Sequence, residues 1–194
     1  MDPTTKLLFF ASPKPSIPMV QFSSTIDAVN GSATGLGSYY GSTGTTSQST
    51  YRHGSFTGSC FFEWTVGSSN WANNSGFAGI MDLTHWNATP NYNSSTGKRM
   101  MMYFGNNYSY GETTGTTLLY GNGITFTAGD VCGCVYNNTT GKLAYYKNGV
   151  LGPVFQNTGF IGIAKYPAVS QWTSNLSSIM ETTPSSYVSS YVYP

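Results

Sequence analysis

The residues best suited to chemistry lie in the stretch GDVCGCVYNNTTGKLAYYKNGVLGPVF, at positions 129–155. Its Cys-x-Cys pair, Cys132 and Cys134, has the donor atoms of a metal or redox site. A zinc site needs about four ligands, however, and the other soft donors stand at no zinc-finger spacing: Cys60, His53 and His85. A phosphate cradle needs a glycine-rich turn that opens a helix, whereas these glycines separate strand-like segments. We therefore expect no metal and no cofactor.

Paired carboxylates are a second catalytic signature, because glycoside hydrolases place two of them across the scissile bond. No two acidic residues of this chain are spaced i, i+2 or i, i+4 on one predicted strand: Asp2, Asp27, Glu63, Asp82, Glu112, Asp130 and Glu181. A Ser-His-Asp group assembled in space around His53 or His85 stays open, since serine is too abundant here to be informative. We expect a protein that is not an enzyme.

The elements that position the cysteine pair are predicted to be strands. Segments 131–136 and 142–147 have strand length, and the Asn148-Gly149 step after them is typical of a type I′ hairpin turn. Segment 150–155 returns as a third strand, so the stretch predicts a meander. Because side chains alternate along a strand, the two cysteines share one face, where we expect them to be buried as small core hydrophobes.

The composition limits the class of protein. The chain of 194 residues has the length of one domain with a substantial core. Only 8% of the residues are charged and the net charge is +1, which argues against nucleic acid and anionic membrane surfaces as partners. An aromatic content of 15% argues against disorder, and strand-favouring residues alternate with glycine-rich breaks. We expect an all-β domain.

Localisation signals are expected to be absent. The apolar patch at 7–11 lacks a charged leader and is followed by three prolines, unlike a signal peptide. No run approaches the roughly 18 apolar residues that span a bilayer. Three cysteines, an odd number, fit no closed disulfide framework and favour reduced thiols. We expect a soluble protein made in a cytoplasm.

Several segments together resemble a SPRY domain: GSCFFEWTV at 58–66, GFAGI at 76–80, GDVCGC at 129–134, LAYYKNG at 143–149, GPVF at 152–155 and YPAVS at 166–170. The resemblance spans residues 24 to 180 and is most specific from 129 to 170. It implies a concanavalin-like, jelly-roll sandwich of two antiparallel sheets that binds partners through loops at one end, without cofactor or catalysis. It also implies that Asp130 fixes a turn by accepting hydrogen bonds from backbone amides.

The two ends of the chain fall outside that resemblance. We expect an extended N-terminal arm at 1–22, a sandwich at 23–183 and a strand-like tail at 184–194, PSSYVSSYVYP. Each arm either packs on its own domain or pairs with a neighbouring copy. As clasps of an oligomer or larger assembly, the arms would use their apolar and aromatic residues: Leu7, Leu8, Phe9, Phe10, Tyr187, Tyr191 and Tyr193.

Recognition is predicted to rest on exposed loop aromatics, which stack on sugars or anchor protein contacts. The candidates precede the strand at 58–66 or lie in Gly-, Asn- and Ser-rich segments: Tyr51, Arg52, Trp71, Trp86, Tyr92, Tyr108 and Tyr110. The alternative is that most of them pack beneath their loops.

An uncharged, Ser-, Thr-, Gly- and Asn-rich β domain with arms resembles bacteriophage decoration, tail and fibre proteins. We therefore expect a virion structural or attachment protein, made in the host cytoplasm. Its expected partners are other virion proteins, copies of itself, or a host surface glycan or protein. A SPRY-type peptide-binding adaptor and a free glycan-binding lectin are the alternatives.

Overall fold

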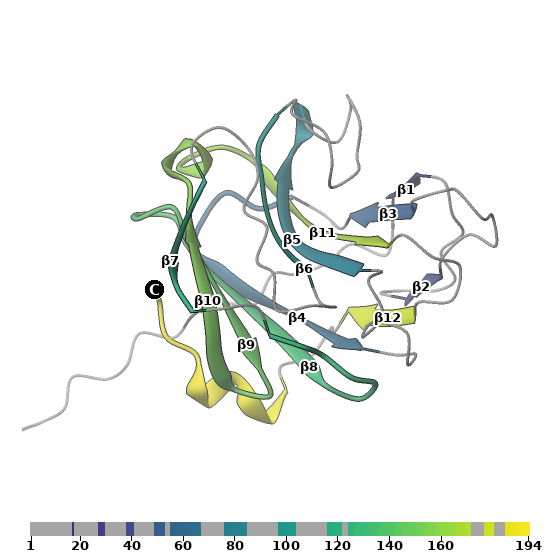
Figure 1. Cartoon of the computed structure of the whole chain (residues 1–194). Coiled ribbons are helices and arrows are strands. Elements are labelled where there is room, and N and C mark those ends of the chain that lie inside the picture. The colour runs from purple at the N-terminus through teal and green to yellow at the C-terminus, as the bar shows by residue number, and fades with distance from the viewer. Residues whose placement is uncertain are drawn as a thin grey trace, which may run out of the picture.

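The chain folds into two antiparallel sheets, which Figure 1 shows face to face in a computed structural model. The structure describes residues 17, 27–29, 38–40, 49–52, 55–66, 76–84, 97–103, 116–121, 124–171, 177–180 and 185–194. The small sheet has, in spatial order, β1 (Asp27–Val29), β3 (Ser49–Arg52), β11 (Lys165–Gln171), β5 (Gly76–Asp82) and β6 (Arg99–Tyr103). The large sheet has, in order, β2 (Ser38–Tyr40), β12 (Ser177–Met180), β4 (Cys60–Val66), β8 (Val131–Asn137), β9 (Lys142–Lys147), β10 (Val150–Gln156) and β7 (Thr117–Tyr120). This confirms the predicted all-β, concanavalin-like sandwich.

The predicted meander forms β8, β9 and β10 of the large sheet. Strand β8 pairs with β9 and β9 with β10, both antiparallel. The turn between β9 and β10 has φ of 48° at Asn148 and 80° at Gly149, as the Asn-Gly step predicted. Glycine adopts this conformation at no steric cost and asparagine tolerates it, so the turn chemistry sets the hairpin.

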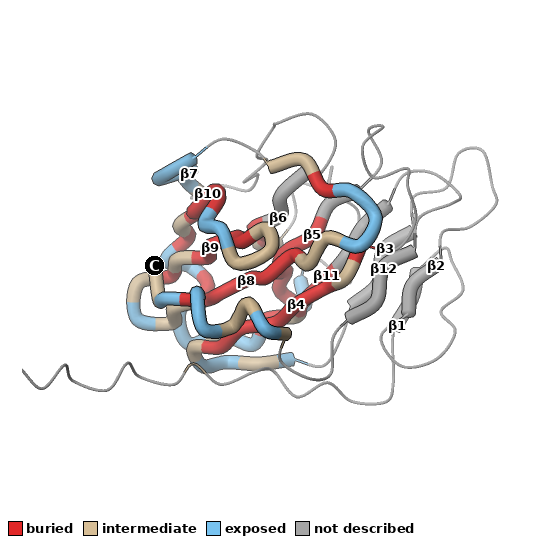
Figure 2. Tube along the Cα trace, turned by 90° about the horizontal axis from the view of Figure 1, so that it is seen from below, coloured by how far each residue is buried: buried red, intermediate tan, exposed pale blue. Residues whose placement is uncertain are grey.

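Alternation along β4 and β8 divides their side chains between the inner and the outer face of the large sheet. Cys132, Cys134 and Tyr136 belong to the core between the sheets, together with Phe62 and Trp64 of the paired strand β4. Figure 2 shows β4 and β8 coloured as buried along most of their length. The two cysteines are fully buried on one face, which confirms their predicted place in the core.

A tyrosine joins the two sheets across the core. The Tyr145 hydroxyl lies 2.8 Å from the carbonyl oxygen of Ala78 and 3.1 Å from that of Met100. These acceptors belong to β5 and β6 of the small sheet, so β9 is bonded to its neighbours across the sandwich. A Cβ on Gly79 would lie 1.9 Å from the same Met100 oxygen, so this close approach requires glycine.

Two short 3-10 helices complete the described elements, η2 (Thr158–Phe160) and η3 (Ser186–Ser190). Among the described residues, no helix has the length and apolar character needed to cross a membrane.

Candidate functional site

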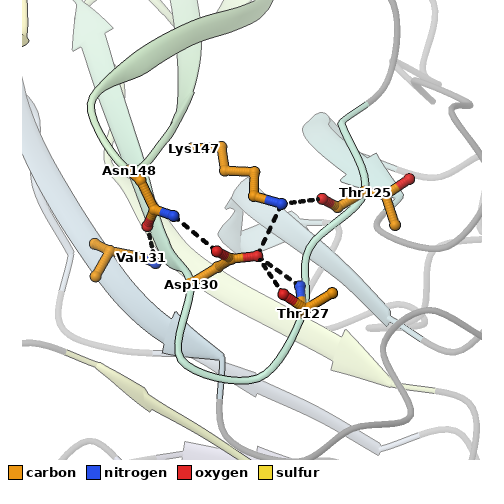
Figure 3. A network of polar contacts seen from close by, with 6 residues as sticks. All are labelled: Thr125, Thr127, Asp130, Val131, Lys147 and Asn148. Carbon is orange, nitrogen blue, oxygen red and sulfur yellow. Dashed lines mark hydrogen bonds and ion pairs between the residues drawn. The ribbon is translucent and has the colours of Figure 1, made fainter.

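Asp130 closes the turn that leads into β8 (Figure 3). Its Oδ2 accepts hydrogen bonds from the backbone N–H of Thr127, at 2.7 Å, and from the Thr127 hydroxyl, at 2.9 Å. The same oxygen lies 2.9 Å from the Nζ of Lys147. Burial alone would raise the pKa of Asp130, but Lys147 and the other donors outweigh it and lower the pKa below its usual range. The prediction that Asp130 fixes a turn through a backbone amide is confirmed.

Lys147, the last residue of β9, and Asn148, in the turn after it, bind this turn to the β9–β10 hairpin (Figure 3). Asn148 donates through Nδ2 to Asp130 at 2.7 Å and accepts through Oδ1 from the backbone N–H of Val131 at 2.8 Å. Lys147 donates to the carbonyl oxygen of Thr125 at 2.8 Å. We call Thr125, Thr127, Asp130, Lys147 and Asn148 the polar clamp. It fixes the hairpin, and therefore the start of β10, relative to segment 124–131.

Exposed apolar side chains lie on β7, which pairs with the last three residues of β10, and at the start of β10, next to the polar clamp. These side chains are between 43% and 70% exposed: Leu118, Leu119, Tyr120, Val150 and Leu151. We call these five residues the apolar edge, because β7 is the last strand of the large sheet. In Figure 2, β7 is coloured as exposed beside the buried strands. Neither β7 nor β10 contains a charged residue.

A hollow of about 370 Å³ lies at one end of the apolar edge, where the polar clamp adjoins it. Its lining residues are Ile124, Lys147, Asn148, Val150 and Leu151. Gly152 allows Ile124 to pack across β10, because a Cβ there would lie 1.9 Å from the Cδ1 of Ile124. The clamp therefore adjoins a mainly apolar hollow beside an uncharged strand, and a hollow of this kind can hold an apolar side chain.

The structure describes two of the seven predicted recognition residues. Tyr51 and Arg52 do not lie in a loop: they belong to β3, which pairs with β1 and β11 inside the small sheet. The strand forms because the segment STYR has neighbours to pair with on both sides, which its local sequence does not reveal. The remaining candidates lie outside the described residues, in the segments between β4 and β7: Trp71, Trp86, Tyr92, Tyr108 and Tyr110.

The C-terminal tail differs from the strand expected over 184–194. Residues Ser186–Ser190 form η3, whose start is capped by the Ser185 side chain, an acceptor for the N–H of Tyr187. Tyr191 is then buried against the outer face of the large sheet, with Tyr187 and Tyr193 partly buried around it. The tail thus packs on its own domain, one of the two alternatives expected, whereas Leu7, Leu8, Phe9 and Phe10 of the N-terminal arm lie outside the described residues.

A buried carboxylate holds this tail in place. Glu63, on the outer face of β4, is fully buried and accepts hydrogen bonds from the N–H of Ser185 at 2.9 Å and its hydroxyl at 2.7 Å. The Tyr191 hydroxyl donates to the same carboxylate. Gly133 provides the space, because a Cβ there would lie 2.0 Å from the Tyr191 oxygen. Burial, and then the hydrogen bond to Glu63, raise the pKa of Tyr191, which therefore stays a donor at neutral pH.

Lys165 is a buried cation that no sequence pattern indicated. Its Nζ lies 3.1 Å from the carbonyl oxygen of Thr57 and 3.3 Å from Oδ1 of Asn138. The same nitrogen stands 4.4 Å from the ring centre of Tyr136 and 5.1 Å from that of Phe56. Burial lowers the pKa of Lys165 to about 8, and the nearby Cys60 opposes this shift.

The three cysteines are free and buried. Burial raises the pKa of Cys60 and of Cys134, so both thiols stay protonated at neutral pH, and a protonated thiol is a poor nucleophile and metal ligand. Within the described ranges, no three His, Cys, Asp or Glu side chains gather closely enough to hold a metal ion. The absence of metal and cofactor stays a prediction for the whole chain.

Comparisons with known proteins agree with the architecture. No protein-family model and no curated protein sequence matches the chain. The structure is similar to the SPRY domain of human HERC1, with a TM-score of 0.56 and 19% identity over 82% of this chain and 96% of that chain. It is also similar to another human SPRY domain, with a TM-score of 0.57 and 11% identity over 82% of this chain and 99% of that one. The chain therefore has the SPRY fold, as its sequence motifs predicted.

Proposed function

We propose that the chain is a non-enzymatic protein-binding module that holds an extended, apolar segment of its partner along the apolar edge. The observation that carries this proposal is the exposure of Leu118, Leu119, Tyr120, Val150 and Leu151 on an uncharged sheet edge. Exposed apolar side chains at the edge of a sheet are a common feature of interaction sites.

The geometry of β7 suits the addition of a partner strand. One side of its backbone pairs with β10, and no other described strand pairs with the opposite side. An extended peptide can hydrogen-bond to such an edge through its main chain, while pockets beside the edge select its side chains. The hollow lined by Ile124, Val150 and Leu151 would accept one apolar side chain of the bound segment.

Three of the described carboxylates support binding rather than catalysis, because each of these three has a structural partner. Glu63 binds the tail, Asp130 belongs to the polar clamp, and Asp82 lies 3.8 Å from the Nζ of Lys98. General acid or base catalysis needs a carboxyl group that can reach a substrate. On this basis we propose that the module performs no chemistry.

The low charge and the Ser-, Thr-, Gly- and Asn-rich composition favour a place for this module in a virus particle, as a structural or attachment protein of a bacteriophage. Mass spectrometry of purified particles would test this role: we expect the chain at a fixed copy number per particle. Its absence from particles would leave the adaptor as the better assignment, and selective retention on a glycan array would favour the lectin.

Selection from a displayed library of random peptides, with the full chain as bait, tests the binding function. We expect enriched peptides to be uncharged and rich in apolar residues that alternate with others. Leu119→Lys should weaken their binding at least tenfold, because it places a charge in the middle of β7. Val192→Lys, at a residue that is 47% exposed in the tail, is the matched control and should bind like the original chain. Peptides that bind both variants equally would refute the assignment of the edge.

A further inference from the structure

We infer that the outer face of the large sheet is a second binding site, and that the tail of another copy of this chain can occupy it in place of the chain's own tail. The tail is residues 185–194, which pack on that face. The site shares no residue with the apolar edge, so the inference does not depend on the proposed function. Copies of the chain would associate by exchanging their tails.

The floor of this site is apolar and contains one carboxylate. Four adjacent strands, β4, β8, β9 and β10, contribute its buried apolar side chains: Phe61, Val135, Ala144, Tyr146 and Val154. Glu63 of β4 lies opposite Gly133 of β8 in the strand register, so the carboxylate stands beside the space that the glycine leaves. The hydroxyl of Tyr191 lies in this space and bonds to the carboxylate. The site therefore has the shape and the acceptor that a tyrosine needs.

The tail binds to this face through side chains of the domain, as a separate ligand could. The backbone–backbone hydrogen bonds described for the tail stay within it, from Val188 to Ser185 and from Tyr191 to Val188. Its bonds to four residues of the domain all involve their side chains: Glu63, Asn137, Thr140 and Tyr146. The tail can therefore leave without breaking a strand pair of either sheet.

The carboxylate makes the site selective. The hydrogen bonds described for Glu63 all come from the tail, two from Ser185 and one from Tyr191. When the tail leaves, water can replace these donors. A segment that covers Glu63 without supplying donors leaves a buried charge unpaired, which weakens its binding. The site therefore favours segments that carry both donors over segments that are merely apolar.

The tail of a second copy is the occupant that meets these requirements. It carries the serine and the tyrosine six positions apart, and the Ser185 side chain caps the turn between them. Serine and tyrosine occur at this spacing once in the chain, so no other segment of a neighbouring copy offers it. An exchanged tail makes the same contacts as the chain's own tail, which competes through its high effective concentration. Exchange is therefore favoured where copies are crowded or where the chain's own tail is impaired.

Two full-chain variants separate the site from the tail. Tyr191→Ala keeps the site but lacks the tyrosine, and Gly133→Ala keeps the tail but fills the space for it. Neither variant should associate alone, whereas their mixture should form a heterodimer in sedimentation with one variant labelled. The double variant Gly133→Ala/Tyr191→Ala is the matched control and should not bind Tyr191→Ala. A mixture that sediments as two monomers, or a control that associates equally, would overturn the inference.

A synthetic peptide of residues 184–194 gives a second measurement. At about a hundredfold excess over its Kd, it should raise the Tm of Tyr191→Ala by roughly 5–10 °C, because it binds only the folded chain. The same peptide with Tyr191→Phe should bind at least about tenfold more weakly, since it leaves Glu63 short of a donor. If Tyr191→Ala is unfolded alone, the first peptide should restore its fold. A peptide that neither stabilises nor refolds this variant would contradict the site.

Discussion

The large sheet has two apolar surfaces: the C-terminal tail covers one of them, and the side chains of the other are exposed. Its outer face is covered by residues 185–194, which bury Tyr191 against Phe61 and Tyr146. Its β7 edge pairs with no second strand among the described residues, and Tyr120 there is 60% exposed. Both surfaces are apolar, so hydrophobicity alone does not determine which of them is covered by the chain's own residues.

The difference lies in anchoring groups. The covered face has a buried carboxylate, Glu63, that requires donors, and a glycine, Gly133, that leaves room for the tyrosine which supplies one of them. An unpaired buried carboxylate would be costly, so the tail is held strongly. The apolar edge presents no comparable group and is bounded by a polar clamp whose charges already pair. In the proposed function, this surface binds a partner.

Removal of Tyr191 should have the largest effect on stability. We expect Tyr191→Ala to lower the free energy of unfolding by about 3–5 kcal/mol, because it empties a buried aromatic site and removes a donor from Glu63. Tyr191→Phe keeps the ring and should cost less, about 1–3 kcal/mol. Denaturant unfolding measures both. If Tyr191→Ala proves as mild as Tyr187→Ala, at a partly buried neighbour, the tail is not held as described.

Loosening the polar clamp should have an intermediate effect. We expect Asp130→Asn to cost about 1–3 kcal/mol near neutral pH, because an amide replaces a carboxylate that faces Lys147 and three other donors. The pKa of Asp130 is lowered in the folded state, so its stabilisation is complete above the unfolded pKa of about 3.9 and is lost as the pH falls through the folded value. The original chain should therefore lose more stability than Asp130→Asn on acidification below about pH 4. Parallel acid titrations of both proteins would contradict this.

Lys165 provides a test of a buried charge whose partners are neutral. Its folded pKa of about 8 is below the ordinary lysine pKa of 10.5, so the unfolded chain holds more protons between these values and stability rises with pH there. Relative to Lys165→Met, the original chain should gain roughly 1 kcal/mol in free energy of unfolding between about pH 7 and about pH 9. The two proteins share their cysteines and tyrosines, so the difference isolates the lysine. A difference that does not change with pH would show that the amine keeps its ordinary pKa.

The smallest effect on stability should come from the apolar edge itself. Leu119 is 45% exposed, so Leu119→Lys should change the free energy of unfolding by no more than about 0.5 kcal/mol. Unfolding curves measured at low concentration give this value directly. A loss as large as that of Asp130→Asn would mean that β7 belongs to the folding core and not to a docking surface.

Local patterns predicted the turns and the strand faces of the large sheet. The Asn148-Gly149 turn, the alternation around Cys132 and Cys134, and the Asp130 turn depend on residues close in sequence, and each was predicted correctly. The SPRY motifs then supplied the arrangement of the sheets. These features are local because turn geometry and strand alternation are set within a few residues.

The site could not be predicted in the same way. Tyr191 fits against Gly133 and Glu63 only through contacts that join distant parts of the chain, whereas the tail sequence PSSYVSSYVYP predicted a strand. The segment TLLY of β7 has the composition of a buried strand, and only its position at the end of the sheet leaves it exposed. Lys165 is surrounded by residues from two distant segments, 56–57 and 136–138, so no local spacing reveals its burial.

Amide hydrogen exchange on the full chain, with and without a selected peptide, tests the central claim most directly. In the free chain at low concentration, the amides of Thr117–Tyr120 should exchange faster than those around Tyr191, since the edge is bare and the tail is anchored. Saturating peptide should slow exchange in β7 and at the start of β10 and leave residues 185–194 unchanged. Protection confined to other segments, with β7 exchanging as in the free chain, would contradict the account.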